Sequence, residues 1–128
     1  MLTVGIKGKE EVLVSEANSA KTLGSGTLDV FATPAMIALM EKTAWMSVAP
    51  HLEEGWGTVG ILLQVTHDAP TPFGMNVWCE SELVEIDGRR LVFDLAAYDE
   101  KGKIGGGRHE RFLIQNEKFQ LKANKKAD

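Results

Sequence analysis

The stretch FATPAMIALMEKTAW, residues 31–45, decides the fold because it predicts one long apolar helix. Thr33 and Pro34 mark its start, since a hydroxyl suits the N-cap and proline is well tolerated at the first helical position. We expect the helix to run to about Val48 and to stop before Pro50. At about 100° per residue its apolar side chains leave no wide polar face, which is typical of a helix buried on most sides.

One carboxylate lies in the middle of this helix. Glu41 is one turn after Ile37 and one turn before Trp45, so it belongs to an apolar stripe. An ionised carboxylate is costly to bury without a partner. The residues leave two interpretations open: a polar side chain at a solvent-exposed edge beside Lys42, or a functional carboxylate in an apolar pocket that acts as a base or orients one.

The residues after the helix predict a run of strands. In TVGILLQVTHDA, residues 58–69, alternation places Val59, Ile61, Leu63, Val65 and His67 on one face. Further strand-like segments are EEVLVSE (10–16), MNVWCESELVEI (75–86), RRLVFDLAAYD (89–99) and KIGGGRHERFLIQ (103–115). A DG pair at 87–88 is a hairpin signal. One helix with several antiparallel strands indicates an α+β fold, a curled sheet wrapped on a central helix.

Composition sets the domain count and the setting. The 128 residues, 44% hydrophobic and 25% charged, fit one globular domain, which we place at 1–120, with 121–128 as a flexible C-terminal tail. A net charge of −4 argues against a nucleic-acid partner, and no apolar run reaches the roughly 18 residues of a membrane span. The single cysteine, Cys79, excludes a disulfide within the chain and fits a cytoplasmic location.

Two further residue types could carry chemistry. His67 ends its strand next to a turn-rich loop, and it is either an ordinary core histidine or a general base near neutral pH. Thr33 is either a helix cap or, with a base nearby, a nucleophile or a group that positions water.

Three consecutive glycines at 105–107 indicate a bulge, a ligand close to the backbone, or a simple strand break.

Several site classes have no support in the residues. The three histidines are scattered, with no H-E-x-x-H or H-x-H spacing, so we expect no metal. There is no G-x-S-x-G elbow of the serine hydrolases, and we expect no cofactor.

Five segments at matched spacing resemble a known family. Over about residues 30–119, without gaps, the chain closely resembles the fluoroacetyl-CoA thioesterase-like branch of the hotdog-fold thioesterases. The segments that carry the resemblance are VFATPAMIALME (30–41), APHLEEGWGTVG (49–60), VTHDAPTPFG (65–74), VEIDGRRL (84–91) and IGGGRHER (104–111). The implied fold is a hotdog, in which five to six antiparallel strands curl around the long helix.

The resemblance also implies a Thr/Glu/His site that hydrolyses an acyl-CoA. The matching residues are Thr33, Glu41 and His67. His67 would take a proton from water or from Thr33, and Glu41 would orient one of these groups or attack the acyl group itself. The residues do not choose among these routes.

Substrate-binding residues follow from the same resemblance and from the glycine run. The resemblance implies that the backbone N–H of Gly60 donates to the oxyanion and that Arg111 lies near the site. We add Gly106 and Gly107 as candidate substrate contacts. Surface lysines and arginines near the late strands, such as Arg90 and Arg108, are further candidates for the CoA phosphates.

The spacing of two site residues adds a geometric constraint. Thr33 and Glu41 are eight residues apart, which is roughly 12 Å along a helix. Either the N-cap region folds back or a second subunit completes the site. The resemblance implies a dimer with sites at the interface, so we expect a homodimer or a dimer of dimers.

One departure bears on the acyl group. In the fluoroacetyl-specific member, aromatic residues before the helix form a lid, whereas the matching stretch here, GSGTLDVF (24–31), has Gly24 and Thr27 in their place. We therefore expect a short or medium acyl-CoA rather than fluoroacetyl-CoA as the substrate. The alternatives are a hotdog hydratase or dehydratase, for which no motif is visible, and a non-catalytic acyl-CoA-binding domain.

Overall fold

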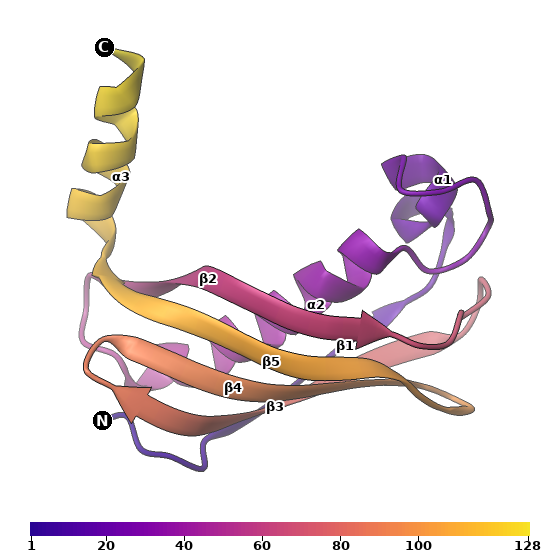
Figure 1. Ribbon diagram of the computed structural model, residues 1–128, viewed down its shortest axis with the longest axis horizontal. Coiled ribbons are helices and arrows are strands. Elements are labelled where there is room, and N and C mark those ends of the chain that lie inside the picture. The colour runs from indigo at the N-terminus through magenta and orange to yellow at the C-terminus, as the bar shows by residue number, and fades with distance from the viewer.

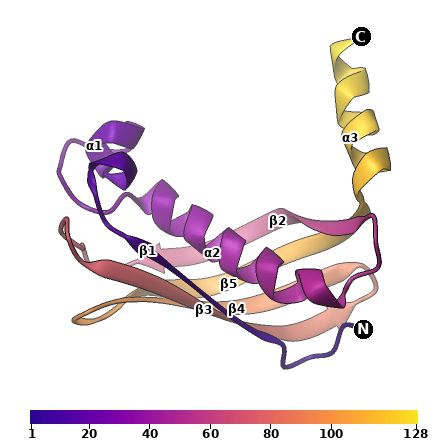
Figure 2. The ribbon, with the colours of Figure 1, turned by 180° about the vertical axis from the view of Figure 1, so that it is seen from behind.

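A long helix lies across one face of a curved antiparallel sheet (Figures 1 and 2). The computed structural model describes residues 1–128. The strands are β1 (Lys7–Leu13), β2 (Trp56–His67), β3 (Asn76–Asp87), β4 (Arg90–Asp99) and β5 (Gly102–Gln115), in the spatial order β1-β3-β4-β5-β2. The helices are α1 (Ala20–Leu23), α2 (Thr33–Val48) and α3 (Asn116–Asn124), with 3₁₀ turns at Glu16–Asn18, Ala49–His51 and Lys125–Ala127. The five strands and the central helix confirm the predicted α+β class.

Helix α2 has the predicted bounds but a different N-cap. The helix begins at Thr33 and ends at Val48, and Pro34 lies in its first turn as expected. The N-cap is Ala32, whose side chain cannot cap, so the capping role predicted for Thr33 is wrong. The Thr33 hydroxyl is instead hydrogen-bonded to a histidine on β2.

One face of α2 forms the core with the sheet. Met36, Met40, Ala44 and Val48, spaced by four residues, are completely buried. Each large side chain buried in this way stabilises the fold by about 1.5–3 kcal/mol. The opposite face is open, because Trp45 remains 44% exposed in the single chain. The expectation of burial on most sides is therefore wrong for one copy of the chain.

A β-bulge in β2 changes which side chains face the helix. The pairing of β2 with β5 shifts between Gly60 and Leu62, so Ile61 is an extra residue and is 50% exposed. Leu63, Val65 and His67 are half-buried, as the alternation predicted. For Ile61 the prediction is wrong, because the bulge reverses the alternation and turns Gly60 toward α2.

The sheet has two edges, at β1 and β2. β1 pairs only with β3, which confirms an edge strand, although it starts before the expected residue 10. β2 pairs only with β5, so its other edge carries no partner within the chain. The DG pair forms the predicted hairpin, in which Asp87 pairs with Arg90 and Gly88 takes a positive φ of 60°.

The C-terminal segment is helical. Helix α3 stands away from the sheet (Figure 1), and none of its residues is buried. Residues 121–128, predicted as a tail, continue this helix and end in the turn Lys125–Ala127. The residues gave no helical period here because no face of α3 packs on the core. None of the helices is long and apolar enough to cross a membrane.

Candidate active site

A hydroxyl–imidazole pair lies where the start of α2 meets the end of β2. The Thr33 Oγ1 and His67 Nδ1 atoms are 2.7 Å apart, within hydrogen-bond distance. They line a surface cavity of about 270 Å³ together with Phe31 and Asp68. Burial holds the pKa of His67 below its ordinary value, although the nearby Asp68 carboxylate raises it. His67 is therefore neutral at physiological pH and can accept a proton.

The second ring nitrogen of His67 lacks a partner. Its Nε2 atom is buried and makes no hydrogen bond within the chain. Buried polar atoms in folded proteins are almost always hydrogen-bonded, so this atom marks a position that another molecule or another subunit can fill.

Glu41 forms a second group in the middle of α2. Its Oε2 accepts a hydrogen bond of 3.1 Å from Nη1 of Arg111. The Glu41 side chain is 39% exposed, whereas that of Arg111 is only 7% exposed. Of the two interpretations left open for Glu41, the apolar pocket is wrong for the single chain: a guanidinium lies on one side and solvent on the other.

Arg111 is held from several directions. Its Nε donates to Thr58 Oγ1 at 2.8 Å, and its Nη2 donates to the Thr58 carbonyl at 3.0 Å. Its Nη1 also lies 3.1 Å from His109 Nε2. Burial lowers the pKa of Arg111, and Glu41 opposes that shift. The guanidinium stays charged and fixed in position, and it holds the Glu41 carboxylate.

His109 was not singled out in the sequence. It is completely buried, with Nδ1 hydrogen-bonded to the Leu62 carbonyl at 2.8 Å. Burial lowers the pKa of His109, and the neighbouring Arg111 lowers it further. The available signal was the period of two in β5, which places His109 and Arg111 on the same face.

The structure keeps the two groups apart within one chain. Thr33 bonds to His67, Glu41 bonds to Arg111, and no hydrogen bond links the two pairs. The residues before the helix do not fold back toward Glu41, because Thr33 is the first residue of the continuous helix α2. Of the two routes to a complete site, the folded-back N-terminus is therefore excluded here.

Gly60 lies directly beside Glu41. A Cβ at this position would collide with Glu41 Oε2 and would lie 3.3 Å from His109 Cε1 and 3.4 Å from Arg111 Nη1. Gly60 thus lies next to Glu41 and Arg111, whereas the donation of its backbone N–H to an oxyanion stays a prediction. A side chain here would push the carboxylate out of its contact with the guanidinium.

We therefore expect Gly60→Ala to lower kcat/KM for the hydrolysis that the resemblance implies by about 10²-fold, as misplacement of a site group by about 1 Å can do. Gly57→Ala is the matched control in the same strand, because its Cβ would meet only the flexible Asn116 side chain. Steady-state kinetics and the melting temperature of both variants check this. Equal kinetics in the two variants would contradict it.

The glycine run has a packing explanation. Residues 105–107 lie inside the unbroken strand β5, so the strand break is wrong, whereas the pairing of β4 with β5 shifts at Ile104, so a bulge lies directly before the run. A Cβ on Gly106 would lie 2.7 Å from the Leu95 carbonyl, and one on Gly107 would collide with the Gln64 carbonyl. Close approach of neighbouring strands requires glycine at both positions, whereas their contact with substrate stays a prediction.

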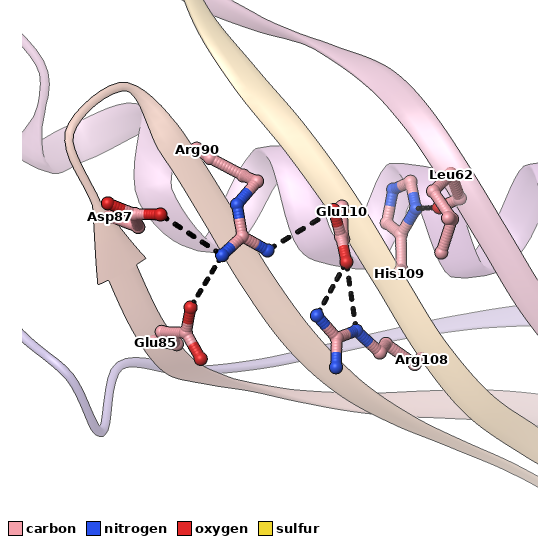
Figure 3. A network of polar contacts seen from close by, with 7 residues as sticks. All are labelled: Leu62, Glu85, Asp87, Arg90, Arg108, His109 and Glu110. Atoms are coloured by element: carbon pink, nitrogen blue, oxygen red, sulfur yellow. Dashed lines mark hydrogen bonds and ion pairs between the residues drawn. The ribbon is translucent and has the colours of Figure 1, made fainter.

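Two of the candidate phosphate-binding arginines are already paired. Arg90 contacts Glu85, Asp87 and Glu110 at 2.7–3.3 Å (Figure 3). Arg108 donates twice to Glu110, at 2.6 and 2.9 Å. These ion pairs make both guanidinium groups poor candidates for the CoA phosphates. No group of three or more His, Cys, Asp or Glu side chains is placed to hold a metal ion.

His109, which is buried, and His67, which is half-buried, predict a pH-dependent stability. An unfolded histidine titrates near pH 6.5, whereas burial lowers the pKa of both His67 and His109 in the folded chain. Between the folded and unfolded values the unfolded chain binds more protons, so stability rises with pH and falls as pH drops below about 6.5. We expect a melting temperature several degrees lower at about pH 5.5 than at about pH 7.5. An unchanged melting temperature across this interval would contradict the prediction.

Comparison with known proteins identifies the class and then the family. A solved structure of the fluoroacetyl-CoA thioesterase FlK superposes with a TM-score of 0.93 at 36% identity, covering 98% of each chain. A Thermus thermophilus member of the thioesterase superfamily superposes with a TM-score of 0.85 at 27% identity, covering 98% of this chain and 97% of that one. With the sheet and helix described above, these matches place the chain among the hotdog-fold thioesterases, enzymes that hydrolyse thioesters.

The family is shown by sequence. The family model described as fluoroacetyl-CoA-specific thioesterase matches residues 14–117. The fluoroacetyl-CoA thioesterase of Streptantibioticus cattleyicolor is 44% identical over 98 residues, which cover 77% of this chain and 70% of the relative. The chain belongs to the fluoroacetyl-CoA-specific thioesterase family.

Proposed function

We propose that the protein hydrolyses a short or medium acyl-CoA to the free acid and CoA. The observation that carries this proposal is the Thr33–His67 pair, in which a neutral imidazole contacts a hydroxyl at 2.7 Å. An imidazole in this position can activate an oxygen nucleophile, either Thr33 Oγ1 itself or a water held beside it. A solved structure of a FlK mutant contains acetyl-CoA, which supports an acyl-CoA as the substrate class.

Glu41 acts in this proposal from a second copy of the chain. Its carboxylate is paired with Arg111 but the side chain stays 39% exposed, and His67 Nε2 in the same chain lacks a partner. A carboxylate that reaches Nε2 would orient the imidazole and stabilise its charged form. We propose that dimer formation brings the two together.

The surface supports such a dimer. The unpaired edge of β2 carries Ile61, 50% exposed, and Leu62, 37% exposed, and Trp45 lies exposed one turn beyond Glu41. An exposed apolar edge strand is a ready site for pairing with another chain. A homodimer, or a dimer of dimers, would cover it.

The length of the acyl group is inferred from the cavities near Thr33 and His67. Phe31 lines both the cavity of Thr33 and His67 and a neighbouring apolar cavity of about 380 Å³, which Ala38 and Leu39 of α2 also line. Gly24 ends α1 at a positive φ of 73° with nothing within 4 Å of a Cβ, so the position of one lid aromatic is open space here. This space favours acyl groups longer than fluoroacetyl. Gly60 and Arg111 serve the thioester, and Gly106 and Gly107 stay candidate contacts.

The test is thiol release from acyl-CoAs that range from fluoroacetyl and acetyl to decanoyl, with His67→Ala and Glu41→Ala beside the wild type. We expect release that is fastest for a chain longer than acetyl and is lost in both variants. Mass spectrometry after rapid quenching identifies the nucleophile, since an acyl adduct on Thr33 marks the hydroxyl. Binding of acyl-CoA without any thiol release would instead favour a non-catalytic binding domain.

We also keep the cytoplasmic location as a proposal. Cys79 is buried and unpaired, and burial raises the pKa of its thiol to about 11. A thiol of this kind is inert toward oxidation and disulfide exchange. Localisation of a fluorescent fusion in the native cell tests the location.

A further inference from the structure

We propose that His109 is a positioning residue: its neutral imidazole holds Arg111 in place, and Arg111 in turn holds Glu41. We propose that protonation of His109 releases Glu41. The inference rests on the proposed function insofar as Glu41 serves catalysis. Its geometry stands independently, because every contact lies within one chain.

The hydrogen bonds define which ring nitrogen carries the proton. The Leu62 carbonyl can only accept, so His109 Nδ1, 2.8 Å away, must donate (Figure 3). The guanidinium of Arg111 can only donate, so His109 Nε2, 3.1 Å from Nη1, must accept. A neutral ring satisfies both contacts in one tautomer only, with the proton on Nδ1.

This tautomer places the carboxylate of Glu41. Nη1 of Arg111 has two N–H groups, and they point to His109 Nε2 and to Glu41 Oε2, each at 3.1 Å. Thr58 accepts from Nε and from one N–H of Nη2. The guanidinium plane is thus fixed by Thr58 on one side and His109 on the other, and it presents one N–H to Glu41.

Protonation of His109 would break the arrangement. A charged ring would place an N–H of Nε2 against the N–H of Nη1, with two positive charges in a fully buried position. The charged groups around the ring act in opposite directions. Arg111 of β5 disfavours the imidazolium, whereas Glu41 of α2 and Glu110 of β5 favour it, and burial is the largest effect of all. The neutral form therefore prevails at neutral pH, and acidification would displace Arg111 and with it Glu41.

His109 has a second contact with a structural meaning. Leu62 lies next to the bulge of β2, so the bond to its carbonyl also ties β5 to that bulge. A purely structural histidine would need only this bond. A positioning histidine needs the acceptor at Nε2, and the two roles can be separated by substitution.

The experiment compares His109→Gln with His109→Asn in the full chain. The amide of glutamine reaches the place of Nε2 and can accept from Arg111, whereas that of asparagine reaches the place of Nδ1 and can donate only to Leu62. We expect His109→Asn to lower kcat by about 10–10²-fold with KM unchanged, and His109→Gln to stay near the wild type.

The pH profile gives a second measurement. On its acidic side, log(kcat/KM) should fall with a slope of two in the wild type, because both His67 and His109 titrate, and with a slope of one in His109→Gln. Retained activity in His109→Asn with loss in His109→Gln would overturn the proposal.

Nuclear magnetic resonance tests the same point without turnover. The ring ¹⁵N shifts of His109 should show a protonated Nδ1 and an unprotonated Nε2. The ¹³C shift of the Glu41 carboxyl should change in His109→Asn but not in His109→Gln. A proton on Nε2, or a Glu41 shift that both variants leave unchanged, overturns the proposal. Absent thiol release with the expected shifts would instead reject the proposed function alone.

Discussion

Replacement of His67 by alanine is expected to lower kcat/KM for the preferred acyl-CoA by about 10²–10⁴-fold, the usual contribution of a general base. The reason is the 2.7 Å contact between His67 Nδ1 and the Thr33 hydroxyl, which no other base in the chain makes. Stability should change little, because His67 is only half-buried and its Nε2 has no partner to lose. Steady-state kinetics together with thermal unfolding separate the two effects.

His51→Ala is the matched control for this prediction. His51 is exposed and lies in the turn after α2, at the opposite end of the helix from Thr33. We expect its kinetics to equal those of the wild type. If His67→Ala kept wild-type activity, or if His51→Ala lost as much as His67→Ala, the role of His67 as base would be rejected.

The second large effect is recovery of activity from two inactive variants. Glu41→Ala and His67→Ala should each be inactive alone, and a refolded equimolar mixture should regain about a quarter of the wild-type activity. Half of the dimers in such a mixture are hybrids. If each site takes His67 from one subunit and Glu41 from the other, one of the two sites in each hybrid is intact. Half of the dimers with half of their sites active gives a quarter of the wild-type activity.

The alternative outcome is equally clear. If Glu41 and His67 of the same chain form the site, a hybrid contains no intact site and the mixture stays inactive. A mixture of Glu41→Ala with Glu41→Gln is the control, because neither chain can supply the carboxylate. Size-exclusion chromatography with light scattering confirms that the hybrids are dimers.

The local sequence pattern was enough to predict much of the fold. The bounds of α2, the hairpin at Gly88 and the antiparallel class were all predictable, because helix period, proline position and turn chemistry act over a few residues. The bulge at Ile61 was not. A single extra residue leaves no mark in an apolar run such as GILL, yet it reverses the alternation and turns Gly60 toward Glu41.

By itself, the sequence of this protein determined the long helix with its carboxylate, the strands that follow it, and the motifs of the thioesterase family, which the family match confirms. Only the tertiary structure decided the partners of the site residues: Thr33 with His67, and Glu41 with Arg111, which also contacts His109. Helix α2 and strands β2 and β5 supply these side chains from positions 34 to 70 residues apart. Contacts over such separations depend on strand order and register, which local periodicity does not encode.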